Sequence, residues 1–330
     1  MKAKGLMKKR LRFEEVEGRR LLSAVPGLHA AAVQAATLAQ SSNWSGYAIT
    51  TQSGYAVTAV SGAWAVPQVT GTGQTAYAAA WVGIDGANSQ TVEQTGTLSQ
   101  ISPNGTASYY AWYEMYPNNM VSITTASTDL VKPGDSMSAS VEYTAANTYT
   151  LTITDANPTT GWTYTTVQHT SSAMARSSAE WIMEAPSSNF GVLPLANFGT
   201  MGFTSAYATV GTASSVDSGS VLPTTPISGF SSAQVSDVYQ IDMAGANQDA
   251  TSALNAAGTG FTVTYDGPTT TTPTPTNPTP PSRHHRGGRY GGPESTAGRA
   301  AVLSSQVHDS SQSASQAARD RLFAFLGRPV

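Results

Sequence analysis

From Asn43 onward the chain is built of short runs of Val, Thr, Tyr, Ile and Trp. Gly, Pro, Asn or Asp interrupts these runs about every 8 to 12 positions, which is the spacing typical of β-strands joined by turns. No stretch of this region keeps the apolar period of an amphipathic helix. We therefore expect an all-β domain, namely an antiparallel β-sandwich of two large sheets with one curved open face. The candidate strands are residues 55–66, 76–85, 91–97, 108–116, 120–125, 136–144, 148–155, 161–168, 178–184, 234–242 and 260–265.

The two ends of the chain differ in composition from this central region. Residues 1–40 begin with a basic cluster and contain no apolar run long enough for a membrane span or an ordinary signal-peptide core. Residues 268–330 open with a Thr- and Pro-rich segment, typical of an extended linker, and continue as a basic tail of low complexity. We therefore predict one folded domain at residues 41–267 between two disordered tails.

The N-terminal segment also carries a pattern associated with export. Residues 13–24 resemble the E-x-R-x-L-L-S leader of many large surface proteins in one group of budding bacteria. This resemblance predicts an extracellular or cell-surface location. A propeptide removed on activation and a plain basic tail are the alternatives for residues 1–40.

Charge and cysteine content exclude several functions. Residues 41–267 contain 14 Asp and Glu against only Lys132 and Arg176, so this region repels nucleic acid. Such a domain gains little positive charge when its carboxylates are protonated, which favours tolerance of acid; an acidic extracellular protein that does not work in acid is the alternative. Cysteine is absent, which excludes disulfides, a thiolate nucleophile and a Cys-containing metal site.

Several common hydrolytic sites lack their residues. His169 is the single histidine of the central region, lies in a polar setting typical of a surface, and belongs to no motif of a nucleophilic triad. No His-x-x-x-His or clustered carboxylate spacing appears, so we expect no metal and no cofactor. Asp217 begins the one Asp-Ser-Gly sequence, whereas an aspartic peptidase needs two such loops to form its dyad, so a surface turn is the better interpretation.

Four other segments are more informative when they are taken together. In the segment at residues 179–184, Glu180, Ile182 and Glu184 share one face of a strand, because side chains alternate along a strand. Trp181 and Met183 point to the other face. We expect the tryptophan face to be buried in the sandwich and the carboxylates to lie on the opposite face. The segments are N-W-S-G-Y at 43–47, A-W-V-G-I-D-G at 80–86 with E-Q-T-G at 93–96, Y-A-W-Y-E-M-Y-P at 110–117, and A-E-W-I-M-E at 179–184.

The order and spacing of these segments resemble the glutamic peptidases, or eqolisins, a family of acid-acting endopeptidases. The family pattern continues with G-D, found here at Gly134 and Asp135, and with a later F-G, found at Phe198 and Gly199. The resemblance covers about residues 43–265. It implies a sandwich of two seven-stranded antiparallel sheets with the active site on a concave face, and unfolded proteins or peptides as substrates.

Position by position, the resemblance implies that Gln94 and Glu184 are the catalytic pair. The residues that it places in lining or supporting roles are Trp44, Trp81, Asp85, Glu114 and Glu180. The chain departs from the family pattern at Glu93, where an apolar residue is usual, and at Tyr110, Met115 and Ala185. These departures bear on specificity and on the acid optimum, and Glu93 would perturb the site if it faced inward.

This residue pair suits peptide hydrolysis by direct attack of water. A glutamate, with a reference pKa of about 4.3, is ionised in mild acid and can take a proton from water and then return it. The side-chain amide of glutamine does not titrate, so it can still donate hydrogen bonds to an oxyanion in acid. We therefore assign Glu184 as base and then acid, and Gln94 as the oxyanion donor.

Two other classes of function remain open at this point. In a carbohydrate-binding or glycoside-hydrolysing sandwich, Glu180 and Glu184 would be the paired carboxylates. Four residues along a strand span about 13 Å, however, which exceeds the roughly 5 to 9.5 Å of glycosidase pairs. A non-enzymatic adhesion module is the third class, consistent with the leader and the Thr/Pro-rich segment. We expect a monomer with no nucleic-acid partner and no membrane span.

Overall fold

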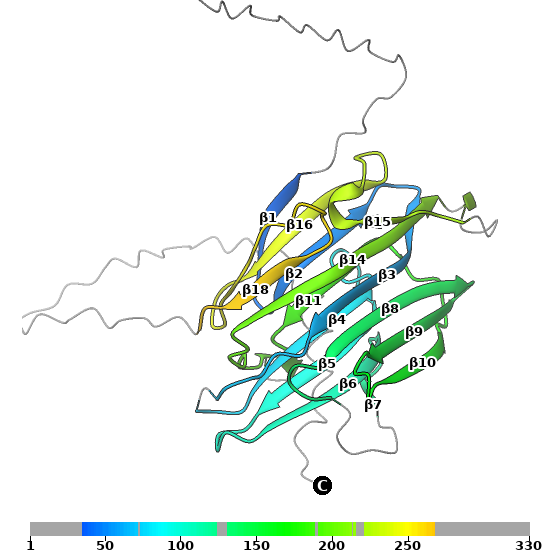
Figure 1. Cartoon of the computed structure of the whole chain (residues 1–330). Coiled ribbons are helices and arrows are strands. Elements are labelled where there is room, and N and C mark those ends of the chain that lie inside the picture. The colour runs from blue at the N-terminus through cyan, green and yellow to red at the C-terminus, as the bar shows by residue number, and fades with distance from the viewer. Residues whose placement is uncertain are drawn as a thin grey trace, which may run out of the picture. The chain divides into compact units, whose positions relative to one another are not determined.

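A computed structural model of the protein describes residues 35–71, 73–123, 131–188, 191–212, 214–215 and 221–267, which form an all-β structure (Figure 1). Most of its strands belong to a single 16-stranded hydrogen-bonded sheet that folds over itself into two layers. The all-β class and the sandwich arrangement predicted from the sequence are thus confirmed. The predicted tails lie outside the described residues, except that β1 (Ala36–Ser41) already belongs to the sheet.

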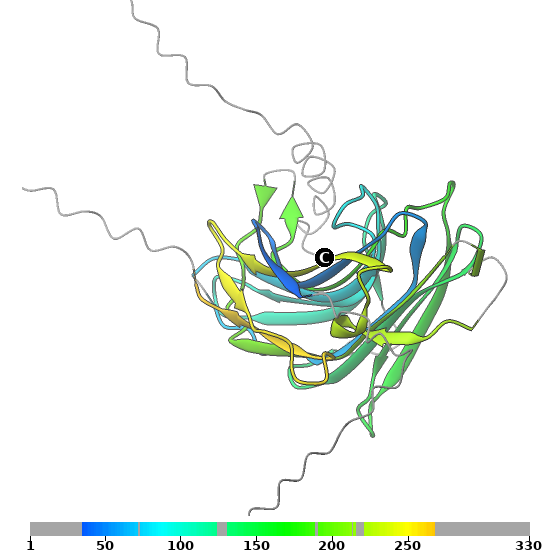
Figure 2. The ribbon, with the colours of Figure 1, turned by 90° about the horizontal axis from the view of Figure 1, so that it is seen from above.

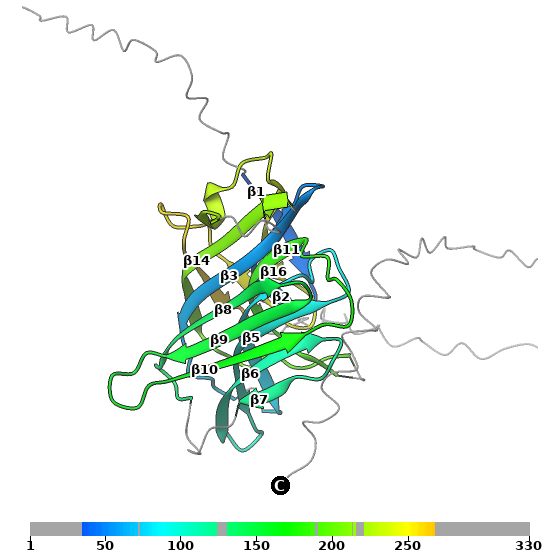
Figure 3. The same ribbon diagram turned by 90° about the vertical axis from the view of Figure 1, so that its right-hand side faces the viewer.

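The first layer runs through β10, β9, β8, β3, β14 and β18 in that order (Figure 3). The bounds of these strands are Trp162–His169 for β10, Thr148–Asp155 for β9, Ser136–Ala145 for β8, Tyr55–Ala65 for β3, Thr200–Thr212 for β14 and Phe261–Tyr265 for β18. All pairings along this layer are antiparallel. A short strand, β15 (Thr224–Pro226), pairs with β14 and leads into a 3-10 turn, η1 (Ile227–Gly229).

The second layer carries the segments singled out from the sequence and runs through β16, β2, β11, β4, β5, β6 and β7. The bounds are Val235–Met243 for β16, Trp44–Thr51 for β2, Ser178–Glu184 for β11, Ala76–Ile84 for β4, Val92–Ile101 for β5, Ala107–Tyr116 for β6 and Val121–Ile123 for β7. The view from above shows the curvature of the stacked strands, with the hairpin of β12 (Ser187–Ser188) and β13 (Gly191–Val192) standing out from them (Figure 2).

The two layers are joined at one edge. Strand β17 (Asp249–Thr251) pairs with β16 of the second layer and with β18 of the first, so the hydrogen-bonded path passes from one layer to the other. Strand β1 is an exception to the antiparallel pattern, because it pairs in parallel with β16. No helix in the described part of the chain has the length and apolar character that a membrane crossing requires.

The apolar side chains form two clusters. The larger cluster fills the space between the layers, where Trp181 of β11 donates a hydrogen bond to the Ser61 carbonyl of β3 (2.7 Å) and Trp64 of β3 donates to Thr97 of β5 (3.0 Å). The smaller cluster, which includes Trp44 and Trp81, covers the other face of the second layer. We call this second surface the pocket face.

Every predicted strand has a counterpart in the structure, and those at 148–155 and 178–184 have the predicted ends. The sequence analysis missed the longer strands β2 and β14, and also β1, β12, β13, β15 and β17. The sequence of β2, W-S-G-Y-A-I-T-T, does not alternate strictly between apolar and polar residues, so it lacks the pattern by which a strand is recognised. In β14 the register shifts between Thr204 and Tyr207, where Ser205 adopts a φ of 50°, and this bulge breaks the alternating pattern.

Candidate active site

Strands β11, β4 and β5 lie side by side and align the motif residues on the pocket face. Gln94 of β5 lies opposite Gly83 of β4, which in turn lies opposite Glu180 of β11. Glu184 of β11 lies opposite Ala79, four positions away along β4. Because paired residues point to the same face, and so do residues four apart, these side chains share the pocket face.

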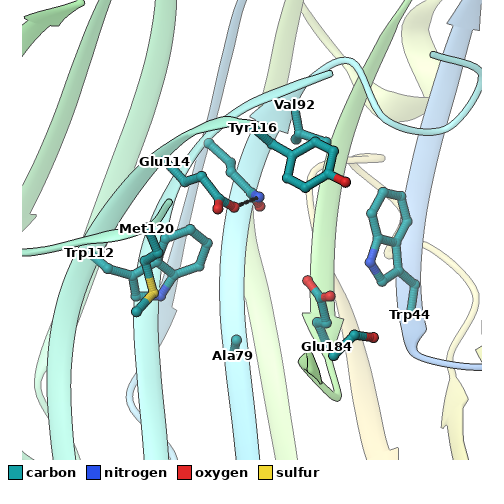
Figure 4. A pocket seen from close by; sticks show the side chains of 10 residues that line it. Trp44, Ala79, Val92, Trp112, Glu114, Tyr116, Met120 and Glu184 are labelled. Carbon is teal, nitrogen blue, oxygen red and sulfur yellow. Dashed lines mark hydrogen bonds between the residues drawn. The ribbon is translucent and has the colours of Figure 1, made fainter. Parts of the chain in front are cut away.

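A pocket opens on this face and brings distant segments together (Figure 4). Its volume is about 460 Å³ when the part open to solvent is included. It is lined by Trp44, Ala79, Val92, Gln94, Trp112, Glu114, Tyr116, Met120, Glu184 and Ser187. Both residues of the expected catalytic pair, Gln94 and Glu184, therefore lie in one pocket.

The Glu184 carboxylate is held by two N–H donors, one from β4 and one from the turn between β1 and β2. The indole Nε1 of Trp81 donates to Oε2 (2.8 Å), and the side-chain amide of Asn43 donates to Oε1 (3.1 Å). Trp81 is fully buried and packs edge-to-face on Trp44, with 5.1 Å between the ring centroids. These contacts fix the carboxylate so that it is directed toward Tyr116 and Glu114 (Figure 4).

The glycine of the E-Q-T-G segment makes room for this tryptophan. Gly96 lies opposite Trp81, and a Cβ atom on Gly96 would overlap the carbonyl oxygen of Ala80 and lie 2.6 Å from the Cβ of Trp81. Only a residue without a side chain lets β4 and β5 pair here. The spacing between Gln94 and Gly96 therefore has a structural cause in the packing of Trp81.

Gln94 is paired with Glu114 of the neighbouring strand β6. The two residues lie opposite each other in the sheet, and Gln94 Nε2 donates to Glu114 Oε2 at 2.6 Å. Gln94 is 6% exposed and Glu114 1% exposed, so the hydrogen bond is buried. Gln94 Oε1 accepts no hydrogen bond from the protein. The bond therefore fixes the plane of the Gln94 amide and uses one of its two hydrogens.

The pKa of Glu114 is raised well above its ordinary value. Burial is the main cause, the negative charge of Glu184 adds to it, and the hydrogen bond from Gln94 acts in the opposite direction. A raised pKa means that Glu114 is a neutral carboxylic acid at acid pH. The pocket thus combines a neutral Glu114 with a second acidic side chain, Glu184, and none of its lining residues is basic.

Of the expected supporting residues, Trp44 and Glu114 line the pocket, whereas Trp81, Asp85 and Glu180 do not. Asp85 is fully buried behind the end of β4, where its carboxylate accepts hydrogen bonds from the backbone N–H groups of Arg176 (2.7 Å) and Ser177 (2.8 Å). Glu180 is also fully buried, and its Oε1 accepts a hydrogen bond from the backbone N–H of Ala87 (3.2 Å). Both carboxylates of β11 therefore lie on the face opposite Trp181, as expected, but only Glu184 of the two lines the pocket.

The departures from the family pattern have different surroundings. Glu93 lies between the layers, on the opposite face from Gln94, so it does not point into the pocket. Met115 belongs to the cluster between the layers, and Ala185 is fully buried in the same cluster. Tyr110 packs against the cluster on the pocket face.

Sequence reasoning missed several residues of the pocket. Asn43 precedes Trp44 in a quoted segment, and Trp112 and Tyr116 lie in another, so these residues were within reach of a motif reading. Met120 and Ser187 belong to no motif, and nothing in the local sequence identifies them. His169 is exposed and contacts Thr148, as expected of a surface histidine, while the Asp217 turn lies outside the described residues.

The sequence profile described as the Peptidase A4 family matches residues 42–265. Aspergillopepsin-2 of Aspergillus niger is 32% identical over 191 residues, an alignment that covers 52% of this chain and 65%, just under two thirds, of that protein.

Two solved structures are also similar to this chain. A structure of scytalido-glutamic peptidase with a peptide-based transition state analog is 27% identical, with a TM-score of 0.49, and covers 68% of this chain and 98% of that one. The aspergilloglutamic peptidase of Aspergillus niger is also 27% identical, with a TM-score of 0.45, and covers 58% of this chain and 99% of that one.

Proposed function

The chain belongs to the Peptidase A4 family, and from this premise we propose that it is an acid-acting endopeptidase with Glu184 and Gln94 as its catalytic pair. The observation that carries the proposal is the shared pocket: a carboxylate of β11 and an amide of β5, distant in the sequence, line one cavity. The residues that orient them, Trp81 for Glu184 and Glu114 for Gln94, add to the support.

In the proposed reaction, ionised Glu184 takes a proton from a water molecule while the water oxygen forms a bond to the carbonyl carbon of the substrate peptide. The carbonyl oxygen becomes an oxyanion, which accepts a hydrogen bond from the Gln94 amide. Glu184 then gives the proton to the peptide nitrogen, the C–N bond breaks, and an amine and a carboxylic acid leave. No covalent bond to the enzyme is formed at any step.

Glu114 has a positioning role in this proposal. Because it accepts one hydrogen of the Gln94 amide, the second hydrogen has a defined direction and is available to the oxyanion. A neutral Glu114 also avoids a second negative charge beside the oxyanion, which an ionised carboxylate would repel. The raised pKa of Glu114 therefore suits the reaction in acid.

The proposed substrates are unfolded proteins or peptides. The pocket is open to solvent and bears aromatic and apolar side chains, among them Trp44, Trp112 and Met120, beside the two polar catalytic groups. This combination suits an apolar side chain of a peptide next to the bond that is cleaved. No observation favours the glycoside-hydrolysing alternative, since the carboxyl of Glu180 is fully buried and does not line the pocket.

The function is tested with the purified 330-residue chain and two substrates, unfolded casein and β-glucan, between about pH 2 and 7, with and without pepstatin. We expect cleavage of casein that is strongest in acid and unaffected by pepstatin, with no release of sugar. Sugar release without proteolysis would favour a glycoside-hydrolysing enzyme instead. Absence of both activities, with the protein shown to be folded, would favour an adhesion module.

The location of the protein is a separate proposal. We propose that the chain is exported, on the basis of the leader-like pattern at residues 13–24. Immunodetection in the culture medium or at the surface of intact cells is the expected result. Detection in the cytoplasmic fraction alone would contradict the proposal.

A further inference from the structure

Glu93 is a buried carboxyl that the proposed reaction does not use. It precedes Gln94 on β5 but points to the other face, between the two layers, where its partners in the adjacent strands are Ile84 and Met115. Both partners belong to the apolar cluster between the layers. Glu93 is 1% exposed, and its Oε2 accepts no hydrogen bond. The surroundings of this carboxyl are therefore those of an apolar core.

The groups that face Glu93 offer it no compensating positive charge. Asp85, which follows β4, adds a negative charge. On the opposite layer, Tyr149 of β9 has a buried hydroxyl without a hydrogen-bond partner, and this residue in turn stacks edge-to-face on Tyr143 of β8. Arg176, which precedes β11, is the cation of this region, but its guanidinium carbon lies 3.8 Å from the centre of the Tyr143 ring.

An apolar setting of this kind favours the neutral form of a carboxyl group. Burial is the main cause and the charge of Asp85 the second, and together they raise the pKa of Glu93 to about 9. In the unfolded chain the same group has its ordinary pKa, near 4.5. The folded state therefore binds one proton more than the unfolded state between these two values, and the fold loses stability as the pH rises through this range.

We propose that Glu93 ties the stability of this fold to acid pH: its side chain fits between the layers as an uncharged acid, and loss of its proton destabilises the β5 region. The residue beside it on the same strand, Gln94, faces the pocket, so loosening of β5 would also disturb the candidate site. The inference concerns only the stability of the folded state relative to the unfolded state. It does not depend on the proposed peptidase activity and is measured without substrate.

The test compares the full chain with two variants and a control. Glu93→Gln and Glu93→Leu both keep an uncharged side chain at this position, and Glu142→Gln removes an exposed carboxylate from β8 as the matched control. Urea unfolding is followed by tryptophan fluorescence at pH 4, 5, 6, 7 and 8. Relative to the two Glu93 variants, the folded-to-unfolded ratio of the wild type should fall by up to about tenfold per pH unit between pH 5 and 8. The control should fall in parallel with the wild type.

Two results would overturn the inference. One is a Glu93→Gln variant whose stability declines with pH as steeply as that of the wild type, since the removed carboxyl would then contribute nothing to the slope. The other is failure of both Glu93 variants to fold at pH 4, because an uncharged side chain is what the proposal requires at this position.

Discussion

Individual glutamates of this domain have very different environments on a single face of one sheet. The carboxylate of Glu184 receives two N–H donors and lies at the pocket, whereas Glu114 accepts a single amide hydrogen and is almost fully buried. Hydrogen bonds to a carboxylate favour its charged form, and burial favours its neutral form. One pocket therefore holds a carboxyl group that receives two hydrogen bonds and a second, more deeply buried one that accepts a hydrogen bond from the Gln94 amide.

The proposed catalytic pair leads to the first prediction. We expect Gln94→Ala and Glu184→Gln each to lower kcat at least about a hundredfold, because one variant removes the oxyanion donor and the other removes the base. Initial rates on a denatured protein substrate near pH 4, together with circular dichroism to verify folding, provide the measurement. The exposed Glu142→Gln control should keep the wild-type rate, and normal turnover in either pocket variant would falsify the assignment.

A second prediction concerns the protonation state of Glu114. If it acts as a neutral acid, Glu114→Gln should preserve most of kcat/KM at pH 4, since an amide oxygen can also accept the hydrogen of Gln94. Glu114→Ala removes this acceptor and should lower kcat/KM roughly 5- to 150-fold, which corresponds to the cost of about 1 to 3 kcal/mol for an unsatisfied buried group. Equal losses in the two variants would show that the charged form is needed.

At the scale of strands, the motif residue Asp85 stabilises the junction between β4 and β11 and does not line the pocket. Its carboxylate accepts hydrogen bonds from the backbone N–H groups of Arg176 and Ser177, directly before the start of β11. It does so from a left-handed backbone conformation with a φ of 69°. The residue thus fixes the position at which β11 begins, and with it the position of Glu184 at the other end of the strand.

This role gives a third prediction, made for stability. Asp85→Ala should lower the free energy of unfolding by about 2 to 5 kcal/mol, because two buried N–H groups lose their acceptor and alanine disfavours a positive φ. Asparagine tolerates this φ and keeps one acceptor oxygen, so Asp85→Asn should lower the free energy of unfolding by less. Urea denaturation at pH 5 gives both values, and equal losses would indicate that Asp85 acts chiefly through its charge.

The whole domain combines many acidic groups with few basic ones, and several of the acids are buried. Asp249 of β17 is 3% exposed, where it accepts hydrogen bonds from Ser45 (2.8 Å) and from the backbone N–H of Met243 (3.1 Å). Burial raises its pKa to about 7. The pKa values of Asp85 and Glu114 are raised as well, again mainly by burial. The fold as a whole is therefore adapted to conditions in which these groups are neutral.

The fourth prediction follows from the sign of these shifts. A group with a raised pKa in the folded state contributes its full stability below its ordinary pKa, which is 3.8 for Asp249, and loses this contribution as the pH rises to about 7. The thermal midpoint of the wild type should therefore fall between pH 4 and pH 8. Asp249→Asn should fall less steeply, while Asp237→Asn, at a half-buried position on β16, serves as the control and should follow the wild type. A midpoint that rises toward neutral pH would contradict the argument.

Much of the fold could be predicted from local pattern. The alternation of side chains placed Trp181 between the layers and Glu184 on the opposite face, and the spacing of turn residues gave most of the strands. Of the strands that were not predicted, the longest are β2, whose sequence does not alternate strictly, and β14, in which a bulge breaks the alternation. A period of two residues is a local property, so it is readable wherever the strand has one buried face and is regular.

The sequence by itself determined the all-β class and the faces of the strands, and its family resemblance led to the proposed pair Gln94 and Glu184. Only the tertiary structure decided that Glu180 is fully buried while Glu184 lines the pocket. It also decided that Glu114 accepts a hydrogen bond from Gln94 and that β17 joins the two layers. The reason is that burial and contact depend on which strands become neighbours, and pairing between distant strands has no signature in either strand alone.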